Sequence, residues 1–306
     1  MDNLLVVASS PHIRAKTSSR KIMGLVLLSL APAGAAGLFF FGTRALLVMA
    51  ASVAACVAAE AIWQRCTKQP VTVSDLSAAL TGLLLAYNLP PSIPLWMAAC
   101  GGVFAIIIAK QFFGGLGQNI VNPALAGRAM MLICWPVAMT TWTLHGVTGP
   151  TPLAIIKSAE SAGSLPSLQS VFLGEIGGCI GETSALALLA GGVLLIATGV
   201  ISWRIPVVYI ATVAAASAVF GRSAGPLYEV LAGGLMLGAF FMATDYATSP
   251  LTAKGQAIFA FGCGLITSLI RSFGGYPEGV SYSILIMNLT VPLIDRATAP
   301  KPLGEA

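Results

Sequence analysis

Residues 22–43 read Ile22-Met-Gly-Leu-Val-Leu-Leu-Ser-Leu-Ala-Pro-Ala-Gly-Ala-Ala-Gly-Leu-Phe-Phe-Phe-Gly-Thr43, without a single charged side chain. A helix needs about 20 mostly apolar residues to cross the hydrocarbon core of a bilayer. Basic residues stand directly before this run: Arg14, Lys16, Arg20 and Lys21. Such residues mark the cytoplasmic flank of a spanning helix, beside anionic lipid. The stretch therefore predicts a first transmembrane helix that begins in the cytoplasm.

The whole chain has the same apolar character. Of its 306 residues, 57% are apolar and 9% are charged, and the mean hydropathy is +0.87. An ordinary soluble domain has about 25% charged residues, and a soluble fold of this size could not hide so much apolar surface from water. The composition predicts a polytopic, all-α membrane protein in lipid. It excludes a nucleic-acid-binding module, a secreted disulfide scaffold and a soluble dinucleotide-binding enzyme.

Apolar runs between charges and Pro/Gly breaks predict about ten transmembrane helices. They cover residues 22–43, 45–63, 75–89, 94–110, 123–139, 182–202, 205–220, 226–243, 256–273 and 279–295. The third and fifth runs are also compatible with broken or re-entrant helices, which a membrane tolerates only where protein covers their backbone.

The basic residues predict the orientation. With ten spans and a cytoplasmic N-terminus, every Lys and Arg lies on the inner side, Arg128 included, except Arg44, Lys157, Arg222 and Arg271. This is the bias expected of cytoplasmic loops. The chain then divides into a cytoplasmic segment (1–21), a first transmembrane half (22–139), an extracytoplasmic loop (140–181), a second transmembrane half (182–295) and a cytoplasmic tail (296–306).

The two halves contain similar segments. Residues 74–88 resemble residues 228–239, and Gly-Gly motifs follow at 114–115 and 274–275. Five helices per half would give the halves opposite topology, and inverted repeats place binding sites at their interface. The alternative is that any two Gly/Ala/Leu-rich helices look alike. Asp75 and Glu229 begin the similar segments and are candidates for an ion path, because ionisable groups inside a membrane are costly; capping of helix ends is the alternative.

Cysteine and histidine usage predicts no metal site. The six cysteines are scattered singly without C-x-x-C spacing, and the chain has two histidines, His12 and His145. Zinc and iron–sulfur sites need clustered ligands. If the protein moves electrons, an organic cofactor must carry them. Phe273, Trp142 and Tyr276 lie near predicted membrane interfaces, where aromatic residues anchor helices.

Several motifs in order carry a family resemblance. The outer loop reads Leu144-His-Gly-Val-Thr148-Gly149-Pro150-Thr151-Pro-Leu153. With it stand Gly115-Leu-Gly117-Gln-Asn119, Asn122-Pro-Ala-Leu-Ala-Gly-Arg128, Met242-Ala-Thr-Asp245, Gly274-Gly-Tyr-Pro-Glu-Gly-Val280 and Pro292-Leu-Ile-Asp295. Together these resemble the family that contains the D-type membrane component of the Rnf electron-transport complex and the B-type membrane component of the sodium-translocating NADH:quinone oxidoreductase.

That resemblance implies a covalent flavin on the outer loop. In the family the pattern is approximately Asp-Gly-x-Ser/Thr-Gly-Ala-Thr, and the last Thr carries FMN through a phosphoester. Here the acceptor would be Thr151, with Thr148 the weaker candidate and Gly149 between them. His145 and Pro150 depart from the pattern. A structural alternative is that Thr151 caps a helix that begins with proline, and a helix N-terminus also favours a phosphate.

A second, non-covalent flavin such as riboflavin is implied towards the cytoplasmic face. Gly115, Gly117, Asn119 and Asn122 are its candidate lining, because glycines allow close backbone approach. The alternative is helix packing through small residues. The segment is no dinucleotide fingerprint, since it lacks a preceding strand.

The function implied is that of one membrane subunit of an Rnf-type complex in a bacterial or archaeal cell membrane. Such a complex couples electron flow between ferredoxin and NAD to Na⁺ or H⁺ movement. The expected partners are the other membrane and peripheral subunits, including a flavin-bearing G-type subunit, and a flavin transferase for maturation. The isolated chain should be inactive. The alternatives are the B-type subunit of the quinone reductase, a non-redox inverted-repeat channel or transporter, and a scaffold without cofactor.

Overall fold

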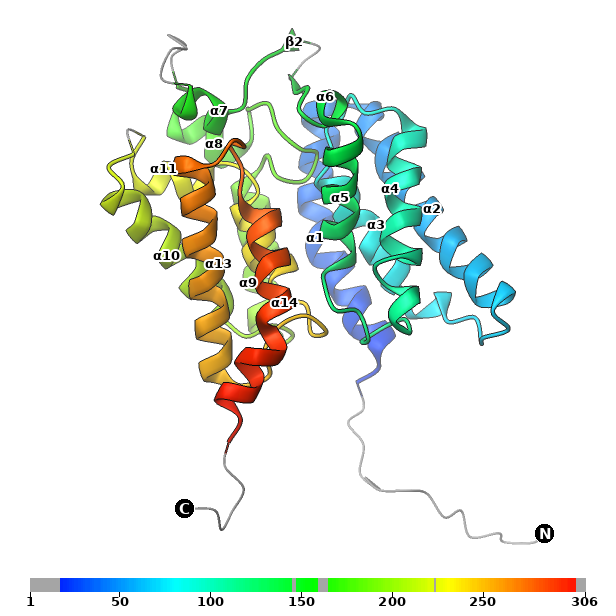
Figure 1. Ribbon diagram of the computed structural model, residues 1–306. Coiled ribbons are helices and arrows are strands. Elements are labelled where there is room, and N and C mark those ends of the chain that lie inside the picture. Colours follow the sequence, from blue (N-terminus) through cyan, green and yellow to red (C-terminus); the bar gives the residue numbers. More distant parts are fainter. Residues whose placement is uncertain (1–16, 145–146, 159–164, 223, 301–306) are drawn as a thin grey trace, which may run out of the picture.

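The computed structural model describes residues 17–144, 147–158, 165–222 and 224–300, and its architecture is helical (Figure 1). Within these described residues, four helical segments are long and apolar enough to cross a membrane: α1 (Ser19–Phe41), α2 (Thr43–Cys66), Leu95–Phe113 and α13 (Ala253–Phe273). With the composition, they identify a multi-pass membrane protein. The number of spanning helices stays a prediction, because several other helices are shorter than a bilayer requires.

The first half of the chain contains α1, α2, the 3₁₀ turn η1 (Val73–Asp75), α3 (Ser77–Tyr87), α4 (Leu95–Ile107), the turn η2 (Gln111–Phe113) and α5 (Pro123–Cys134). Helix α2 packs against α3 and α4, and α4 packs against α5. Glycine lets α3 approach α2 closely, because a Cβ on Gly82 would lie 2.7 Å from the Cα of Val53. Small residues at such crossings are typical of helices in membranes.

The second half contains α9 (Ala185–Ala197), α10 (Arg204–Val219), α11 (Pro226–Leu231), α12 (Leu235–Leu237), the π-helical turn η3 (Gly238–Met242), α13 and α14 (Val280–Thr298). Helix α10 packs against α11 and α13, and α13 packs against α14. The halves meet where α1 packs against α9 and α5 against α14. The contacts of α10 with α11 and α13, and of α13 with α14, parallel those of α2 with α3 and α4, and of α4 with α5, while the inverted repeat itself stays a prediction.

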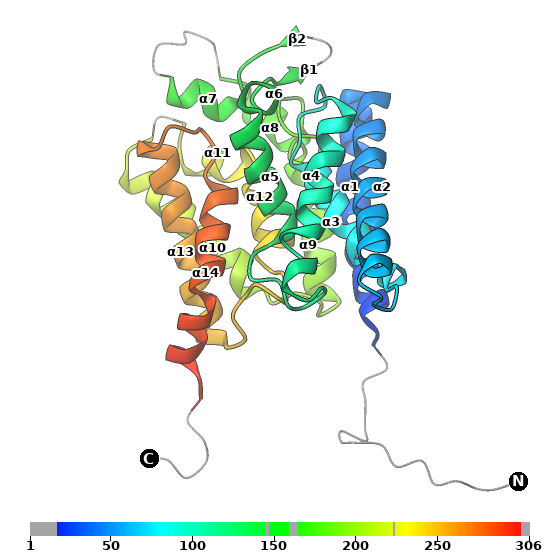
Figure 2. The same ribbon diagram turned by 45° about the vertical axis from the view of Figure 1, so that its right-hand side comes forward.

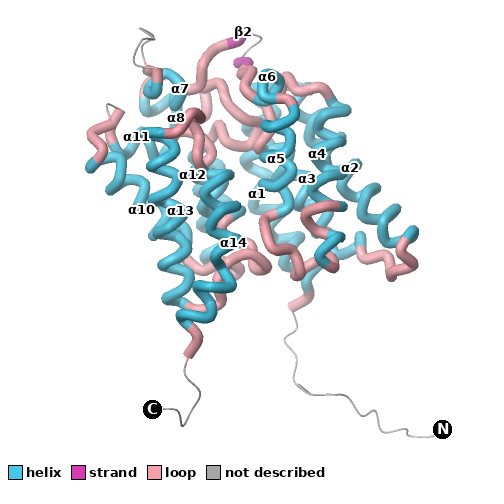
Figure 3. Tube along the Cα trace, in the orientation of Figure 1, coloured by secondary structure: helices cyan, strands magenta, loops and turns pink. Residues whose placement is uncertain are grey.

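Short elements of the connection between the halves gather at one end of the bundle. They are α6 (Pro136–Met139), the two-stranded antiparallel pair β1 (Thr143–Leu144) and β2 (Val147–Thr148), α7 (Pro152–Lys157) and α8 (Leu168–Leu173). Figures 1 and 2 show them opposite the end where α1 begins and α14 ends. The tube in Figure 3 places the strands at the same end. The start of α1 and the end of α14 therefore share one face.

Three of the predicted spans are shorter than expected or interrupted, and one of them, 123–139, breaks at Trp135 between α5 and α6. Helix α3 has 11 residues, or about 16 Å at 1.5 Å per residue, roughly half of the ~30 Å hydrocarbon core. The run 226–243 breaks at Ala232, Gly233 and Gly234, where Gly233 has φ +70° and Ala232 is extended. A left-handed glycine ends a helix without steric cost. Apolar composition alone does not reveal the break at Gly233, because the run stays apolar through it.

Candidate functional site

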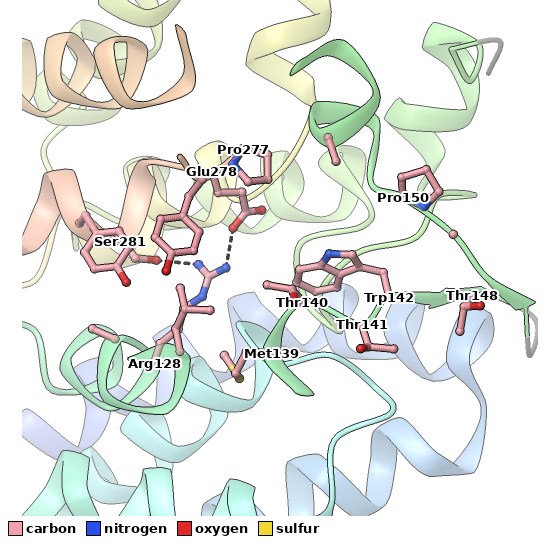
Figure 4. A pocket seen from close by; sticks show the side chains of 16 residues that line it. Arg128, Met139, Thr140, Thr141, Trp142, Thr148, Pro150, Pro277, Glu278 and Ser281 are labelled. Atoms are coloured by element: carbon pink, nitrogen blue, oxygen red, sulfur yellow. Dashed lines mark hydrogen bonds and ion pairs between the residues drawn. The ribbon is translucent and has the colours of Figure 1, made fainter. Parts of the chain in front are cut away.

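A cavity of about 550 Å³ lies under the loop that contains β1 and β2. Figure 4 shows Arg128 at one side, Trp142 at the centre and Thr148 and Pro150 at the other side. Its wall also includes Gly149, Tyr276, Glu278, Ser281 and Tyr282. Cavities of about 300–1,000 Å³ with aromatic walls and a few convergent polar groups are typical small-molecule sites.

The charged wall of this cavity is built on Arg128. This residue is 7% exposed and lies in the second turn of α5, which Asn122 caps. Nη2 donates to Glu278 Oε2 at 2.5 Å, and Nη1 donates to Ser281 Oγ at 2.6 Å. Nη1 also reaches Asn88 Oδ1 at 3.0 Å and Glu182 Oε1 at 3.4 Å. Buried charges persist only when paired and hydrogen-bonded in this way.

Glu278 is held in its ionised form. Burial by itself would raise the pKa of Glu278, but the charge and hydrogen bond of Arg128, the Glu182 side chain and the charge of Arg271 together hold that pKa below its ordinary value. A nearby guanidinium favours the carboxylate form. The cavity therefore has an ionised Arg–Glu pair on one wall and aromatic rings on the others.

Thr151 is the N-cap of α7. Its Oγ1 accepts a hydrogen bond from Ala154 N at 3.2 Å, and Pro152 occupies the first helical position. The side chain is 8% exposed and lines a cavity of about 10 Å³ next to the large one, whereas Thr148 is exposed and lines the large cavity itself. In this structure Thr151 therefore acts as a helix cap, which is the structural alternative to a flavin acceptor. His145 lies outside the described residues.

Lys157 fastens α7 to the second half. Its ammonium donates to the carbonyl oxygens of Ile270 and Tyr276, at 3.4 and 2.7 Å, and to that of Gly274. These carbonyls lie at and beyond the C-terminal end of α13, where a cation complements the helix dipole. Burial, and then the charge of Arg222, lower the pKa of Lys157. The loop that carries Thr151 is therefore positioned by α13.

A second cavity, of about 260 Å³, lies at the end of the bundle where α1 begins and brings three of the four predicted glycine and asparagine residues together. Gly117, Asn119 and Asn122 line it with Phe240 and Asp245. Burial raises the pKa of Asp245, against the opposing effect of hydrogen bonds that stabilise its carboxylate. Gly115, the fourth of the predicted residues, is not among the residues that line this cavity; its φ is +94°.

The two ion-path candidates occupy different environments. Asp75 is partly exposed and precedes the N-cap Leu76 of α3; its Oδ1 accepts from the first residue of that helix, Ser77 N and Oγ, at 2.8 and 2.6 Å. Glu229 is 1% exposed, and its carboxylate pairs with Arg222 and Arg271. Among the described residues, neither carboxylate lines one of the two polar cavities.

Sequence reasoning misses several buried charges, Lys110 and Arg271 among them. The orientation rule places Arg128 at the inner surface, but it lies inside the protein, paired with Glu278. Glu182 reaches the same guanidinium, although no motif singles it out. Glu60 lies near the end of a predicted helix, where solvation of its charge would be ordinary. In the structure this residue is 1% exposed, and its Oε1 lies 2.9 Å from Lys110 Nζ. The available signal is a charge inside an apolar run, which in a membrane protein indicates a buried partner.

Comparisons with known proteins agree over nearly the whole chain. A family model described as the NQR2, RnfD, RnfE family matches residues 6–304. The D component of the Na(+)-translocating ferredoxin:NAD(+) oxidoreductase complex of Acetobacterium woodii is 54% identical over 306 residues, covering 98% of this chain and 95% of that protein. The corresponding component of the proton-translocating ferredoxin:NAD(+) oxidoreductase complex of Clostridium ljungdahlii is 48% identical, covering 99% and 97%. That of the ion-translocating oxidoreductase complex of Escherichia fergusonii is 38% identical, covering 98% of both chains.

Proposed function

The chain belongs to the NQR2, RnfD, RnfE family, and from this membership we propose that it is the D-type membrane component of an ion-translocating ferredoxin:NAD oxidoreductase complex. The full-length identity to the D-type components of such complexes carries this proposal. The protein takes part in electron transfer coupled to Na⁺ or H⁺ transport, together with other membrane and peripheral subunits, among them a flavin-bearing G-type subunit.

The electron carrier of this protein is an FMN bound through its phosphate to Thr151. The large cavity supports this proposal because its volume, about 550 Å³, lies within the range of small-molecule sites. Gly149, Pro150 and Ala154, the close neighbours of Thr151, line it. The N-terminus of α7 offers backbone donors to a phosphate on Thr151, which would replace the hydroxyl as the cap of that helix.

When bound, FMN supplies the electron-transfer chemistry, and the protein supplies position and electrostatics. Trp142, Tyr276 and Tyr282 provide aromatic faces in the cavity wall. Arg128 contributes a fixed positive charge, because Glu278 and Ser281 hold its guanidinium in place. Lys157 holds the loop that carries Thr151 against the C-terminal end of α13 through its hydrogen bonds to backbone carbonyls.

Intact mass with in-gel flavin fluorescence tests the proposal, after co-expression with the flavin transferase that attaches the FMN. The wild-type chain should gain one FMN phosphoryl adduct, and Thr151→Ala should lack it. Thr148→Ala tests the exposed alternative, and Thr140→Ala is the matched control because Thr140 lines the same cavity outside the motif. An adduct that persists in Thr151→Ala moves the tether, and a wild-type chain without adduct overturns the covalent flavin.

The second cavity is the proposed place of a non-covalent flavin. Gly117, Asn119 and Asn122 converge there, but its volume of about 260 Å³ is below the usual ~300–1,000 Å³. A bound ring therefore requires the Gly-rich turn to move outward. Extraction of flavin after denaturation tests this, with Asn119→Leu expected to lose the non-covalent flavin and to keep the covalent one.

The orientation follows from the basic residues and the shared face of α1 and α14. Both termini are cytoplasmic and residues 140–181 are extracytoplasmic. Labelling of single cysteines at exposed Thr148 and at exposed Lys254 with an impermeant reagent in intact cells should modify the first alone. The reverse pattern would overturn the orientation.

A further inference from the structure

A small polar cavity adjoins the site described above. It measures about 10 Å³ and is lined by Thr151, Glu182, Thr183, Gly233 and Glu278, among others. This volume is close to the least that holds one water molecule, so the space fits one water or one small cation. It lies at Gly233, just beyond the end of α11, and broken helices are where membrane transporters bind ions.

Two carboxylates, those of Glu182 and Glu278, line this cavity and share one guanidinium, that of Arg128. Glu278 takes the close contact with Arg128 at 2.5 Å, whereas Glu182 has a contact with the same guanidinium at 3.4 Å. Arg271 pairs with Glu229 and donates to the carbonyl of Ala232, and its charge reaches Glu278 without a direct ion pair to Glu182. Glu182 is 4% exposed, and a buried carboxylate without full compensation is costly.

A second observation points into the same space. Thr183 is 2% exposed and lines the cavity, and within the described part of the chain its Oγ1 has no hydrogen-bond partner. A buried hydroxyl without a partner indicates an unseen ligand, water or ion. Glycine at position 234 leaves room for the Glu182 carboxylate, because a Cβ on Gly234 would lie 2.4 Å from Glu182 Oε1.

We infer that Glu182 and Thr183 form a binding site for one monovalent cation, Na⁺ or a proton, beside the loop that carries Thr151. A Na⁺ would take oxygen ligands from the carboxylate and the hydroxyl, in keeping with the preference of hard cations for oxygen. A proton would sit on the Glu182 carboxyl group, which is hydrogen-bonded to the Glu278 side chain. Either occupant would offset the charge of Glu182, which has only the longer contact with Arg128.

A titration of the Glu182 carboxyl group would depend on the charged and titratable groups around it. The charged and titratable groups facing it are Arg128 from α5, Glu278 from the loop before α14, and Cys179 from its own loop. Cys179 Sγ donates to Asn88 O at 3.2 Å. The site stands on these contacts alone; that its cation is the transported ion rests on the proposed function.

The test uses the full-length chain in lipid nanodiscs. Equilibrium binding of radioactive sodium measures Na⁺, and difference infrared spectroscopy across a pH titration measures a protonated carboxyl group. Glu182→Gln removes the charge, and Thr183→Val removes the hydroxyl at nearly constant shape. Glu175→Gln is the matched control, because Glu175 is an exposed carboxylate of the same loop.

If Na⁺ is the occupant, the wild-type chain binds one saturably, and Glu182→Gln and Thr183→Val weaken binding about tenfold or more, as the loss of a hydrogen-bonding or charged ligand implies. If a proton is the occupant, the carboxyl band titrates in the wild type and in Glu175→Gln and is missing from Glu182→Gln. Both results support the site and distinguish its occupant. Unchanged Na⁺ binding together with an unchanged carboxyl band in Glu182→Gln overturns it.

Flavin content is read from the same samples. A chain without flavin that still shows the cation signal contradicts the proposed function and leaves this site standing. A flavinylated chain without the signal contradicts only the site. Thr183→Val keeps the test decisive if Glu182→Gln fails to fold.

Discussion

Arg128 of α5 binds Glu278, which precedes α14, and so joins the first half of the chain to the second across 150 residues. The pair forms a wall of the large cavity, and Glu278 also lines the small one. Its position at the boundary of the two halves is that expected for a functional site between repeats.

Replacing Arg128 with methionine should destabilise the protein strongly. The change leaves Glu278 and Glu182 without their guanidinium, and breaking a buried ion pair on one side costs about 3–5 kcal/mol. Chemical unfolding in detergent measures the free energy. Arg204→Met is the control, since Arg204 is exposed. Equal losses for both variants would contradict a special role for Arg128.

Glu278 should contribute stability that depends on pH. Its pKa is held below the ordinary value, so its contribution is fully present above about pH 4.3 and is lost as pH falls through the lowered pKa. We expect the stability difference between wild type and Glu278→Gln to be largest near neutral pH and to shrink in acid. The measurement is the unfolding midpoint of both proteins against pH, and a difference that grows in acid would contradict the sign.

Glu60 and Lys110 should show strong energetic coupling. Lys110 Nζ lies 2.9 and 3.1 Å from the two Glu60 oxygens and 2.6 Å from Ser77 Oγ, and both charged side chains are buried. Glu60→Gln or Lys110→Met alone should cost about 3–5 kcal/mol, because each strands a buried charge. The double variant should cost clearly less than the sum. An additive double-mutant cycle would contradict a direct pair.

Gly82→Ala should weaken the contact between α2 and α3. The added Cβ would lie 2.7 Å from Val53 Cα and 3.0 Å from Ser52 O, backbone atoms that cannot turn away. Overpacking of this kind costs about 1–3 kcal/mol. Gly275→Ala is the matched control, since a Cβ there meets nothing within 4 Å. The thermal unfolding midpoint of the two variants separates them, and equal midpoints would contradict the close approach.

The membrane class and most helix positions could be predicted from the sequence, because apolar runs such as 22–43 are long and free of charge. Sequence proximity also grouped Gly117, Asn119 and Asn122, which stand close together in the chain and line one cavity. Both features involve residues that are close in the sequence, so a local sequence pattern is enough to predict them.

The charge cluster could not be predicted in the same way. Glu182 and Glu278 lie 54 and 150 residues beyond Arg128 in the chain. Only the packing of the halves brings them together, and no periodicity encodes such a pairing. The break at Gly233 was hidden for a different reason, since its flanks are as apolar as a continuous helix.

The shortness of α3 has a consequence for how the protein is made. A segment of 11 residues cannot rest across a bilayer by itself, and its free ends need protein around them. We expect it to settle only when its packing neighbours α1, α2, α4 and α5 are present. The first half is therefore expected to insert as a group of helices and not one helix at a time.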